Sequence, residues 1–175
     1  MESLEQLYKP IIQKIIDDNR RFYGFQQIIE WDFFANENVA IVGMVSNNLK
    51  LQINLYSVEV AYTRNEPLNI EYFILHEIRH IYQRLFILYC RQNYIEDISA
   101  IQWERELNGY ISIEQDENTY YNQSIEFDAF CYSYAVMMYK YGKVPYIDYP
   151  KFYHLTDEFD NKVSKWMRIF ESQNL

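Results

Sequence analysis

The hydrophobic positions in the N-terminal part of the chain follow first a helical period and then a strand period. Apolar residues recur three or four positions apart from Leu4 to Ile16, which predicts an amphipathic helix. Val39–Val45 is apolar and largely β-branched, and Leu49–Leu55 alternates strictly between apolar and polar residues after a Ser-Asn-Asn turn. These two segments predict a hairpin with a half-buried second strand, and Trp31–Phe34 is a further candidate strand.

Helical periods dominate the rest of the chain. The core stripe of one long helix, which is expected to begin near Asn69, consists of Ile74, Ile78, Ile81, Leu85 and Leu88. Further helices are expected at 98–107, 124–141 and 157–170, with a polar, turn-rich segment at 108–123. The second long helix should end before Gly142 and Pro145, and its expected stripe is Phe127, Cys131, Tyr134 and Met138. These elements predict an α+β single domain that is mostly helical and carries a small antiparallel sheet.

Composition narrows the possible partners of the chain. Its 175 residues carry a formal net charge of −9, which argues against binding duplex nucleic acid or anionic lipid, since both require a surplus of Lys and Arg. Cys90 and Cys131 are too few for a disulfide framework, so both are expected to be small buried residues in a reducing compartment. The N-terminus lacks a secretory signal, and the apolar stretch 73–90 contains three charged residues. We therefore expect a cytoplasmic protein with no membrane span.

Candidate chemistry lies in His76-Glu77-Ile78-Arg79-His80, an HExxH motif inside the long central helix. Residues four apart lie one above the other on a helix, so both imidazoles can reach one metal ion while Glu77 projects beside it. Zinc suits imidazole ligands and an open water position. The alternative is a pair of ordinary packed histidines, but His76 and His80 lie about 140° to 160° from the centre of the core stripe.

A zinc site of this type needs a third ligand, and the best candidate is Glu126, in the first turn of the second long helix. Ala129, one turn further on, would let the two helices approach closely enough for a short carboxylate to reach the metal. Asp128 lies about 200° from Glu126 around the helix, so the two carboxylates cannot both face the ion. The alternative interpretation is that Glu126 is not a ligand but part of an acidic first turn that interacts with the helix macrodipole.

The motif His76–His80, followed by Glu126-Phe-Asp-Ala-Phe-Cys-Tyr, resembles gluzincin-like zinc metallopeptidases, and looks most like the ImmA/IrrE-type small metallopeptidases of bacteria and their phages. The similarity covers residues 70–83 and 124–139. It implies a zincin-like single domain over residues 1–175 with a long HExxH active helix. It also implies that His76, His80 and Glu126 hold Zn²⁺, and that Glu77 is the general base that activates the zinc-bound water.

A peptidase of this type also needs a surface that holds the substrate and a group that stabilises the oxyanion, and both are expected outside the motif. The resemblance implies that a sheet edge above the active helix holds the substrate backbone, and Leu49–Leu55 is the candidate; a core-facing strand with a wet outer side is the alternative. A donor for the developing oxyanion is also needed. His154, the third histidine, is the candidate catalytic residue, and the other possible donors are Tyr120, Tyr121, Tyr132 and Tyr134.

The sequence therefore predicts a zinc-dependent metallopeptidase that hydrolyses peptide bonds of a cytoplasmic protein or peptide. Two alternatives stay open. One is a catalytically weak or inactive metallopeptidase-like binding or inhibitor module, encoded by a phage or mobile element, that acts through its acidic surface. The other is a metal-dependent hydrolase of non-peptide substrates.

Overall fold

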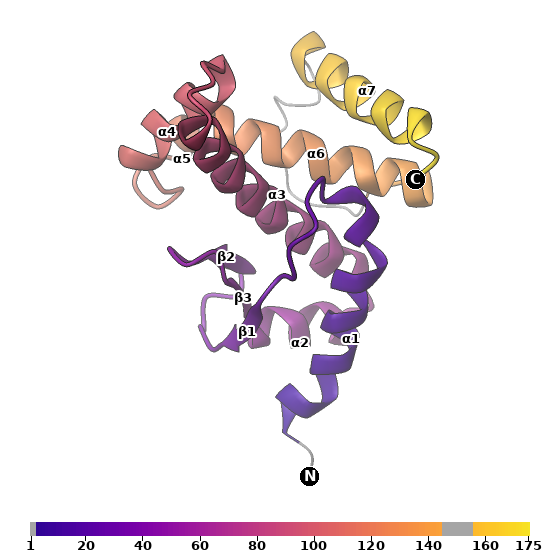
Figure 1. Cartoon of the computed structure of the whole chain (residues 1–175). Coiled ribbons are helices and arrows are strands. Elements are labelled where there is room, and N and C mark those ends of the chain that lie inside the picture. The colour runs from indigo at the N-terminus through magenta and orange to yellow at the C-terminus, as the bar shows by residue number, and fades with distance from the viewer. Residues whose placement is uncertain (1–2, 145–155) are drawn as a thin grey trace.

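The computed structural model describes residues 3–144 and 156–175, and their elements follow the chain in the order shown in Figure 1. The elements are α1 (Leu4–Asp18), the short 3₁₀ helix η1 (Arg20–Phe22), β1 (Trp31–Phe34), β2 (Gly43–Val45), β3 (Leu51–Asn54), α2 (Leu55–Thr63), α3 (Pro67–Gln92), α4 (Ile98–Asn108), α5 (Glu117–Asn122), α6 (Ser124–Tyr141) and α7 (Asp157–Ser172). The fold is α+β and mostly helical, as the sequence predicts.

The helix ends follow local capping chemistry. Ser3 and Gln6 form a reciprocal capping box at the start of α1, and Pro67 occupies the first turn of α3, where its missing N–H costs no hydrogen bond. Asp97 accepts a hydrogen bond from Ala100 N at the start of α4. These signals explain why the predicted bounds of the longer helices agree with the structure to within a few residues.

Three strands among the described residues form one mixed sheet in the order β1-β3-β2. β3 runs antiparallel to β2 and parallel to β1, so the prediction of a purely antiparallel sheet is wrong. β3 is also hydrogen-bonded on both sides, which leaves no room for an added strand on Leu49–Leu55. Leu51 and Ile53 are buried, in agreement with the alternative of a core-facing strand. The edge strand that contacts α3 is β2.

The parallel pairing arises because segment 35–42 crosses over the end of β3, and one buried side chain fixes this crossing. The Asn54 amide nitrogen donates to the carbonyl oxygens of Asn36, Asn38 and Ile41, and its oxygen accepts from Asn36 N. The same oxygen caps α2 by accepting from Tyr56 N. The strand therefore ends at Asn54, and the residue that the sequence pattern placed in the strand, Leu55, begins a helix.

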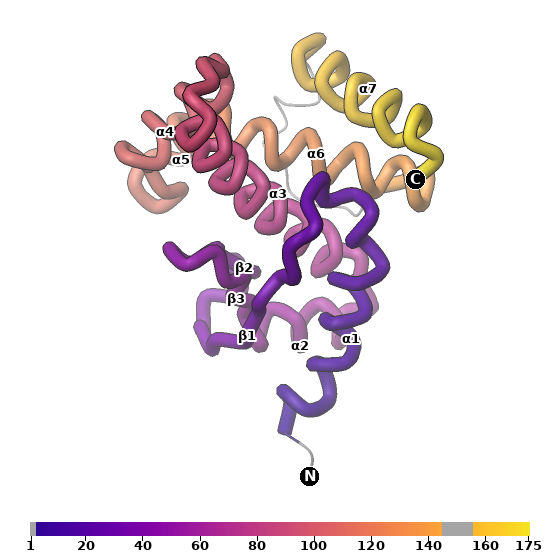
Figure 2. Tube along the Cα trace, in the orientation of Figure 1, coloured from indigo at the N-terminus to yellow at the C-terminus, as the bar shows by residue number. Residues whose placement is uncertain are grey.

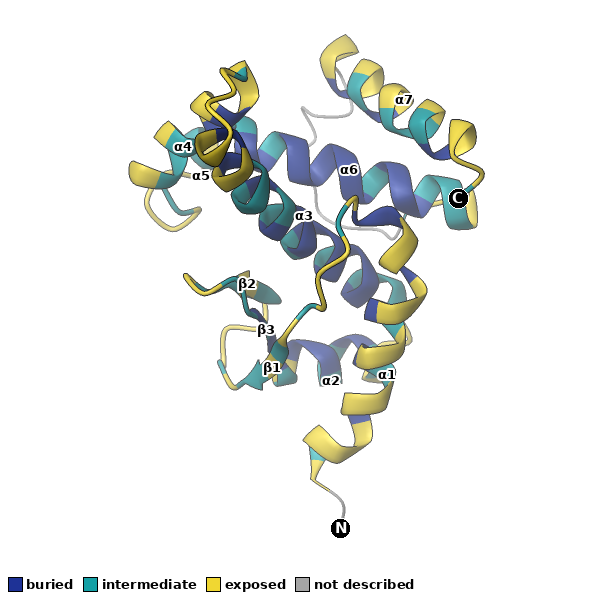
Figure 3. Cartoon of the chain, in the orientation of Figure 1, coloured by how far each residue is buried: buried dark blue, intermediate teal, exposed yellow. Residues whose placement is uncertain are grey.

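α3 lies between the sheet on one side and α6 on the other, and α7 covers α6 on the side away from the sheet (Figure 2). α6 is buried along most of its length, whereas α1 exposes one face (Figure 3). Ala129 of α6 is fully buried, as expected where two helices approach closely. The expected stripe of α3 is wrong at its end, because Leu88 lies beyond the main core and is 44% exposed.

Two short helices were absent from the sequence prediction. α2 follows β3 directly and buries Ser57, Val58 and Ala61, and α5 lies inside the segment that was expected to be turns. No helix within residues 3–144 and 156–175 is long and apolar enough to cross a membrane.

Candidate metal centre

The HExxH motif and Glu126 meet where α3 crosses α6. The Nε2 atoms of His76 and His80 lie 3.0 Å apart, His76 Nε2 lies 3.2 Å from Glu126 Oε2, and His80 Nε2 lies 3.4 Å from Glu126 Oε1. His76 and Glu126 are buried, and His80 is nearly so. Three ligand atoms of the type that metals bind therefore converge on one point.

The spacing of these atoms fits a tetrahedral zinc site. With metal–ligand bonds of about 2.0–2.1 Å, neighbouring ligand atoms of a tetrahedral site lie about 3.3 Å apart, close to the separations between His76, His80 and Glu126. Glu126 Oε2 is buried, and in the described part of the chain its close neighbour is His76 Nε2, 3.2 Å away, to which no hydrogen bond is formed unless the imidazole carries a proton there. A buried carboxylate oxygen in this position is costly unless a protonated imidazole or a bound cation satisfies it.

Gln83, one turn after His80 on α3, sets the orientation of the His80 ring. The Gln83 amide nitrogen donates to Ile125 O and to Asp128 Oδ2, both at 2.9 Å. Its oxygen therefore faces His80 Nδ1 at 2.8 Å and accepts the proton of that nitrogen. This leaves the lone pair of neutral His80 on Nε2, toward Glu126 and His76. His76 Nδ1, in contrast, is buried with no hydrogen-bond partner among residues 3–144 and 156–175.

The loop between α4 and α5 brings one hydroxyl to the other oxygen of Glu126. Tyr110 donates to Glu126 Oε1 at 2.9 Å. The next residue, Ile111, exchanges two backbone hydrogen bonds with the Gln123 side chain, which precedes α6. Glu106 of α4 accepts from the backbone N–H groups of Ser124 and Ile125 and thereby caps α6. These contacts hold Glu126 and Tyr110 together.

Glu77 lies beside the cluster, against the edge strand β2. A Cβ atom placed on Gly43 would lie 3.0 Å from Glu77 Cγ and 3.2 Å from Gln52 O, so only glycine leaves this space to the glutamate. Burial raises the pKa of the Glu77 carboxyl, and the charge of Glu126 adds to this, against the opposing effect of His80 and His76. A raised pKa suits a carboxylate that must take up a proton.

The electrostatics of the cluster are strongly coupled. Burial lowers the pKa of His80, but the charge of Glu126 and its hydrogen bond outweigh this effect and raise the pKa to about 9. For Glu126, burial raises the pKa, and the neighbouring imidazoles reverse this and hold it well below its ordinary value. Without a metal ion, the cluster therefore retains a proton on histidine near neutral pH, opposite an ionised carboxylate.

Arg79 of α3 and Asp128 of α6 form a buried ion pair outside the group of three ligand atoms. Arg79 Nε donates to Asp128 Oδ2 at 2.8 Å, and Lys162 of α7 lies 3.1 Å from Asp128 Oδ1. The Arg79 guanidinium also contacts several aromatic rings, including those of Tyr82 and Trp166. The charge inside the motif thus serves helix packing, and Asp128 is placed away from the three ligand atoms, as the helical spacing predicts.

The proposed oxyanion donors are placed differently from one another. His154 lies outside the described residues. Tyr120 is partly buried close to Glu126, and its burial together with the Glu126 charge raises its pKa. Tyr132 is not near the cluster, because its hydroxyl donates to Phe22 O and its ring packs on Trp166. Tyr134 likewise packs on Phe159, and Tyr121 stacks at an angle against Phe130, whose ring contacts His76.

Sequence reasoning missed three residues of the site. Gln83 follows His80 by three positions, and this helical spacing could have indicated it. Gly43 carries a weaker signal, since a glycine inside a strand pattern often marks a close approach. Tyr110 lies in an aperiodic segment and offers no such signal.

No protein-family model, curated protein or solved structure matches this chain. The assignment of a function therefore depends on the geometry of the site.

Proposed function

We propose that this chain is a zinc-dependent peptidase whose metal ligands are His76, His80 and Glu126. The observation that carries this proposal is the convergence of two imidazole nitrogens and one carboxylate within 3.4 Å of one another, with Glu77 beside them. Two imidazoles and one carboxylate are a common catalytic zinc set, and the orphaned Glu126 oxygen supports a bound cation.

The architecture supports a zincin-like fold within the gluzincin and ImmA/IrrE-type group. In this arrangement, the helix with the two histidines has a sheet on one side and the helix with the glutamate on the other. α3, the sheet and α6 have these relative positions. The free, buried Cys90 and Cys131 suit a reducing compartment such as the cytoplasm, where we place the substrate.

Zinc held by this set would polarise a substrate carbonyl and make water a stronger acid. Glu77 would accept a proton from the attacking water and return it to the leaving amine, a task for which its raised pKa is suited. Gln83 would keep the His80 ring in the ligating orientation. Tyr110 is the hydroxyl we propose for stabilising the developing oxyanion, because it already lies 2.9 Å from the ligand carboxylate.

Strand β2 is the edge that we propose for the substrate backbone. Among the described residues it pairs with β3 on one side only, and it contacts α3 next to Glu77. An extended peptide added there would place its carbonyl groups along the active helix.

Metal analysis of purified protein tests the first half of the proposal. We expect about one zinc per chain in the wild type and a large loss in Glu126→Ala. Glu114→Ala is the control, because Glu114 is an exposed acid outside the cluster. A wild-type protein that takes up no zinc at micromolar supply would refute the metal site.

The Glu77→Gln variant tests the second half. It keeps the size of the side chain but cannot take up a proton, so zinc content should stay unchanged while peptide hydrolysis falls by about 10²-fold or more. If biological activity survives in this variant, the protein acts as a binding module rather than as an enzyme. Hydrolysis confined to esters or other non-peptide substrates would instead favour a different hydrolase.

A further inference from the structure

A hollow of about 390 Å³ lies further along α3 from the metal centre. Its walls come from three elements: the turn between β2 and β3 with Asn47, Asn48 and Leu49, the C-terminal half of α3, and the end of α4. The α3 part contributes Arg84, Ile87, Leu88 and Arg91, and the α4 part contributes Glu104, Leu107 and Asn108. Apolar walls with two arginines are unusual in a chain of net charge −9.

The hollow is aligned with the site along one face of α3. Glu77, His80, Arg84, Leu88 and Arg91 follow one another at intervals of three or four residues, so they share that face. With a rise of 1.5 Å per residue, Arg84 lies about 6 Å and Leu88 about 12 Å beyond His80 along the helix axis. An extended peptide advances about 3.3 Å per residue, so this span corresponds to about two to four residues.

Arg84 is the arginine of the hollow that forms no ion pair with a carboxylate of the described residues. Its Nη1 atom donates to Ser46 O at 3.1 Å, and its Nε atom has no hydrogen-bond partner within the described part of the chain. Glu77 and Tyr110 are the groups close enough to interact with its charge. Arg91, in contrast, forms an ion pair with Glu104. The hydrogen-bonding capacity of the Arg84 guanidinium is therefore only partly used.

We propose that this hollow is a substrate subsite that binds a carboxylate, with Arg84 as the group that recognises it. The carboxylate belongs to a residue about two to four positions from the cleaved bond, and the apolar walls of Leu49, Ile87 and Leu107 contact its aliphatic part. It comes either from an Asp or Glu side chain or from the C-terminus of the substrate. This inference rests on the proposed peptidase activity and adds a substrate class to it.

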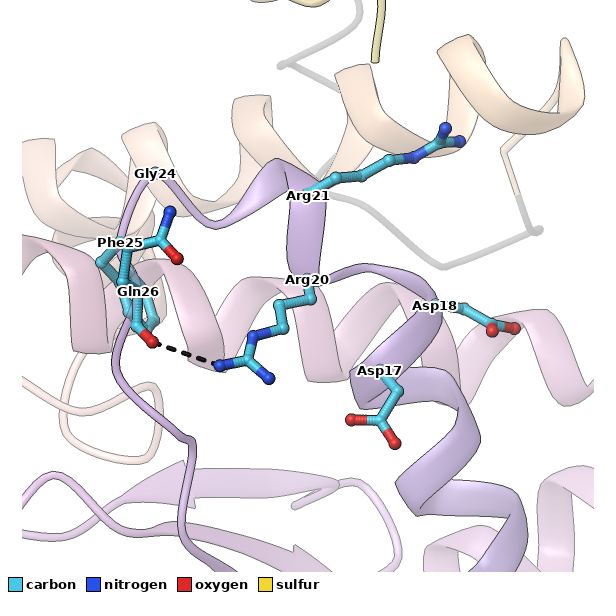
Figure 4. Close-up of a pocket in the computed structure, with 7 residues that line it drawn as sticks. All are labelled: Asp17, Asp18, Arg20, Arg21, Gly24, Phe25 and Gln26. Carbon is cyan, nitrogen blue, oxygen red and sulfur yellow. Dashed lines mark hydrogen bonds between the residues drawn. The ribbon is translucent and has the colours of Figure 1, made fainter.

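The test uses zinc-loaded protein and a synthetic library of random peptides, made once with free C-termini and once as C-terminal amides. Cleavage positions are read by mass spectrometry for the wild type, Arg84→Gln and Arg84→Lys. Arg20→Gln is the matched control. Arg20 also donates to a backbone carbonyl, that of Gln26, beside another hollow, of about 440 Å³, at the end of α1 (Figure 4).

If the carboxylate is a side chain, Asp and Glu should be enriched about two to four positions from the cleaved bond in both libraries. If it is the C-terminus, cleavage should require the free-acid library and occur near the peptide end. In either case Arg84→Gln should lower cleavage of the preferred peptides by about tenfold or more. Arg84→Lys should retain part of the preference, and Arg20→Gln should retain all of it.

Failure of the subsite and failure of the peptidase proposal give different results. Cleavage without any preference for a carboxylate, or a preference that persists in Arg84→Gln, overturns the subsite and leaves the peptidase standing. Binding of the same library to zinc-loaded Glu77→Gln, measured by pull-down and mass spectrometry, is the second readout. If the protein binds carboxylate-containing peptides selectively, and Arg84→Gln abolishes this binding, the hollow is supported as a ligand site. If the wild type nevertheless cleaves no peptide, the peptidase proposal is overturned. If neither binding nor cleavage of the library is observed, both the subsite and the peptidase proposal are overturned.

Discussion

Replacing Asp128 by Asn distinguishes the structural role of this α6 carboxylate from the metal-binding role proposed for Glu126. Asp128 Oδ2 accepts from Arg79 Nε and from Gln83 Nε2, and its other oxygen faces Lys162. An asparagine whose oxygen takes the place of Oδ2 keeps the first two hydrogen bonds, but it removes the negative charge and turns its NH₂ group toward Lys162, so that ion pair is lost as well. The substitution therefore leaves the Arg79 guanidinium buried without a counter-charge, while Gln83 continues to orient His80.

The magnitude follows from the burial of the pair. The side chains of Arg79 and Asp128 are 6% and 3% exposed, and removing one partner from such a pair costs about 3–5 kcal/mol. The retained hydrogen bonds and the aromatic rings around Arg79 favour the lower end, so we expect about 3 kcal/mol. For a chain of this length, that loss lowers the melting temperature by about 6–12 °C.

The assay is urea unfolding of metal-free protein, so that zinc binding does not add to the stability of either variant. Lys162→Gln is the control, since Lys162 is 32% exposed and its loss should cost under about 1 kcal/mol. The zinc content of Asp128→Asn should equal that of the wild type. A loss of stability below about 1 kcal/mol, or a loss of zinc, would refute this reading of Asp128.

Four further outcomes follow from the site. Gly43→Ala should lower the turnover rate of peptide hydrolysis while the stability changes little, because the new methyl group would displace Glu77. An unchanged turnover rate in a peptide-cleavage assay would contradict the close approach of Gly43 to Glu77. Tyr110→Phe should lower the turnover rate with little change in zinc content, as judged by steady-state kinetics and metal analysis. Gln83→Leu should weaken zinc binding by about 10- to 100-fold in a competition titration, since the orientation of the His80 ring is lost. Zinc affinity should rise with pH up to about 9. Burial lowers the pKa of His80, but the charge of Glu126 outweighs this effect, so below that pH the ion must displace a proton from His80. An affinity that does not change between pH 6 and about 9 would exclude this proton.

Much of the candidate site could be predicted from sequence because its residues follow helical spacing. The interval of four residues between His76 and His80 places both imidazoles on one face wherever the helix lies. In the same way, the fixed angle of about 100° per residue places Glu126 and Asp128 on different sides of α6. The side of α6 that faces α3 could not be derived in this way: helical spacing shows that only one of the two carboxylates can join the histidines, and the preference for Glu126 comes from the resemblance to gluzincin-like metallopeptidases.

The features that the sequence does not predict depend on contacts between distant segments of the chain. The direction of β1 follows from the hydrogen bonds of buried Asn54 with the segment 35–42, and no local pattern encodes them. The sequence pattern does not indicate where α2 begins, because Asn54 both ends β3 and caps α2. Tyr110 reaches Glu126 only through the tertiary placement of its loop.

The carboxylate of Glu106 has a consequence that extends past its own helix. By binding two successive N–H groups at the beginning of α6, it fixes the rotational phase of that helix. Slippage by one position would turn Glu126 through about 100° and carry it out of reach of the imidazoles. The geometry of the proposed zinc site is thus set by a half-buried residue that is not one of its ligands, and laboratory evolution of zinc affinity could begin at Glu106.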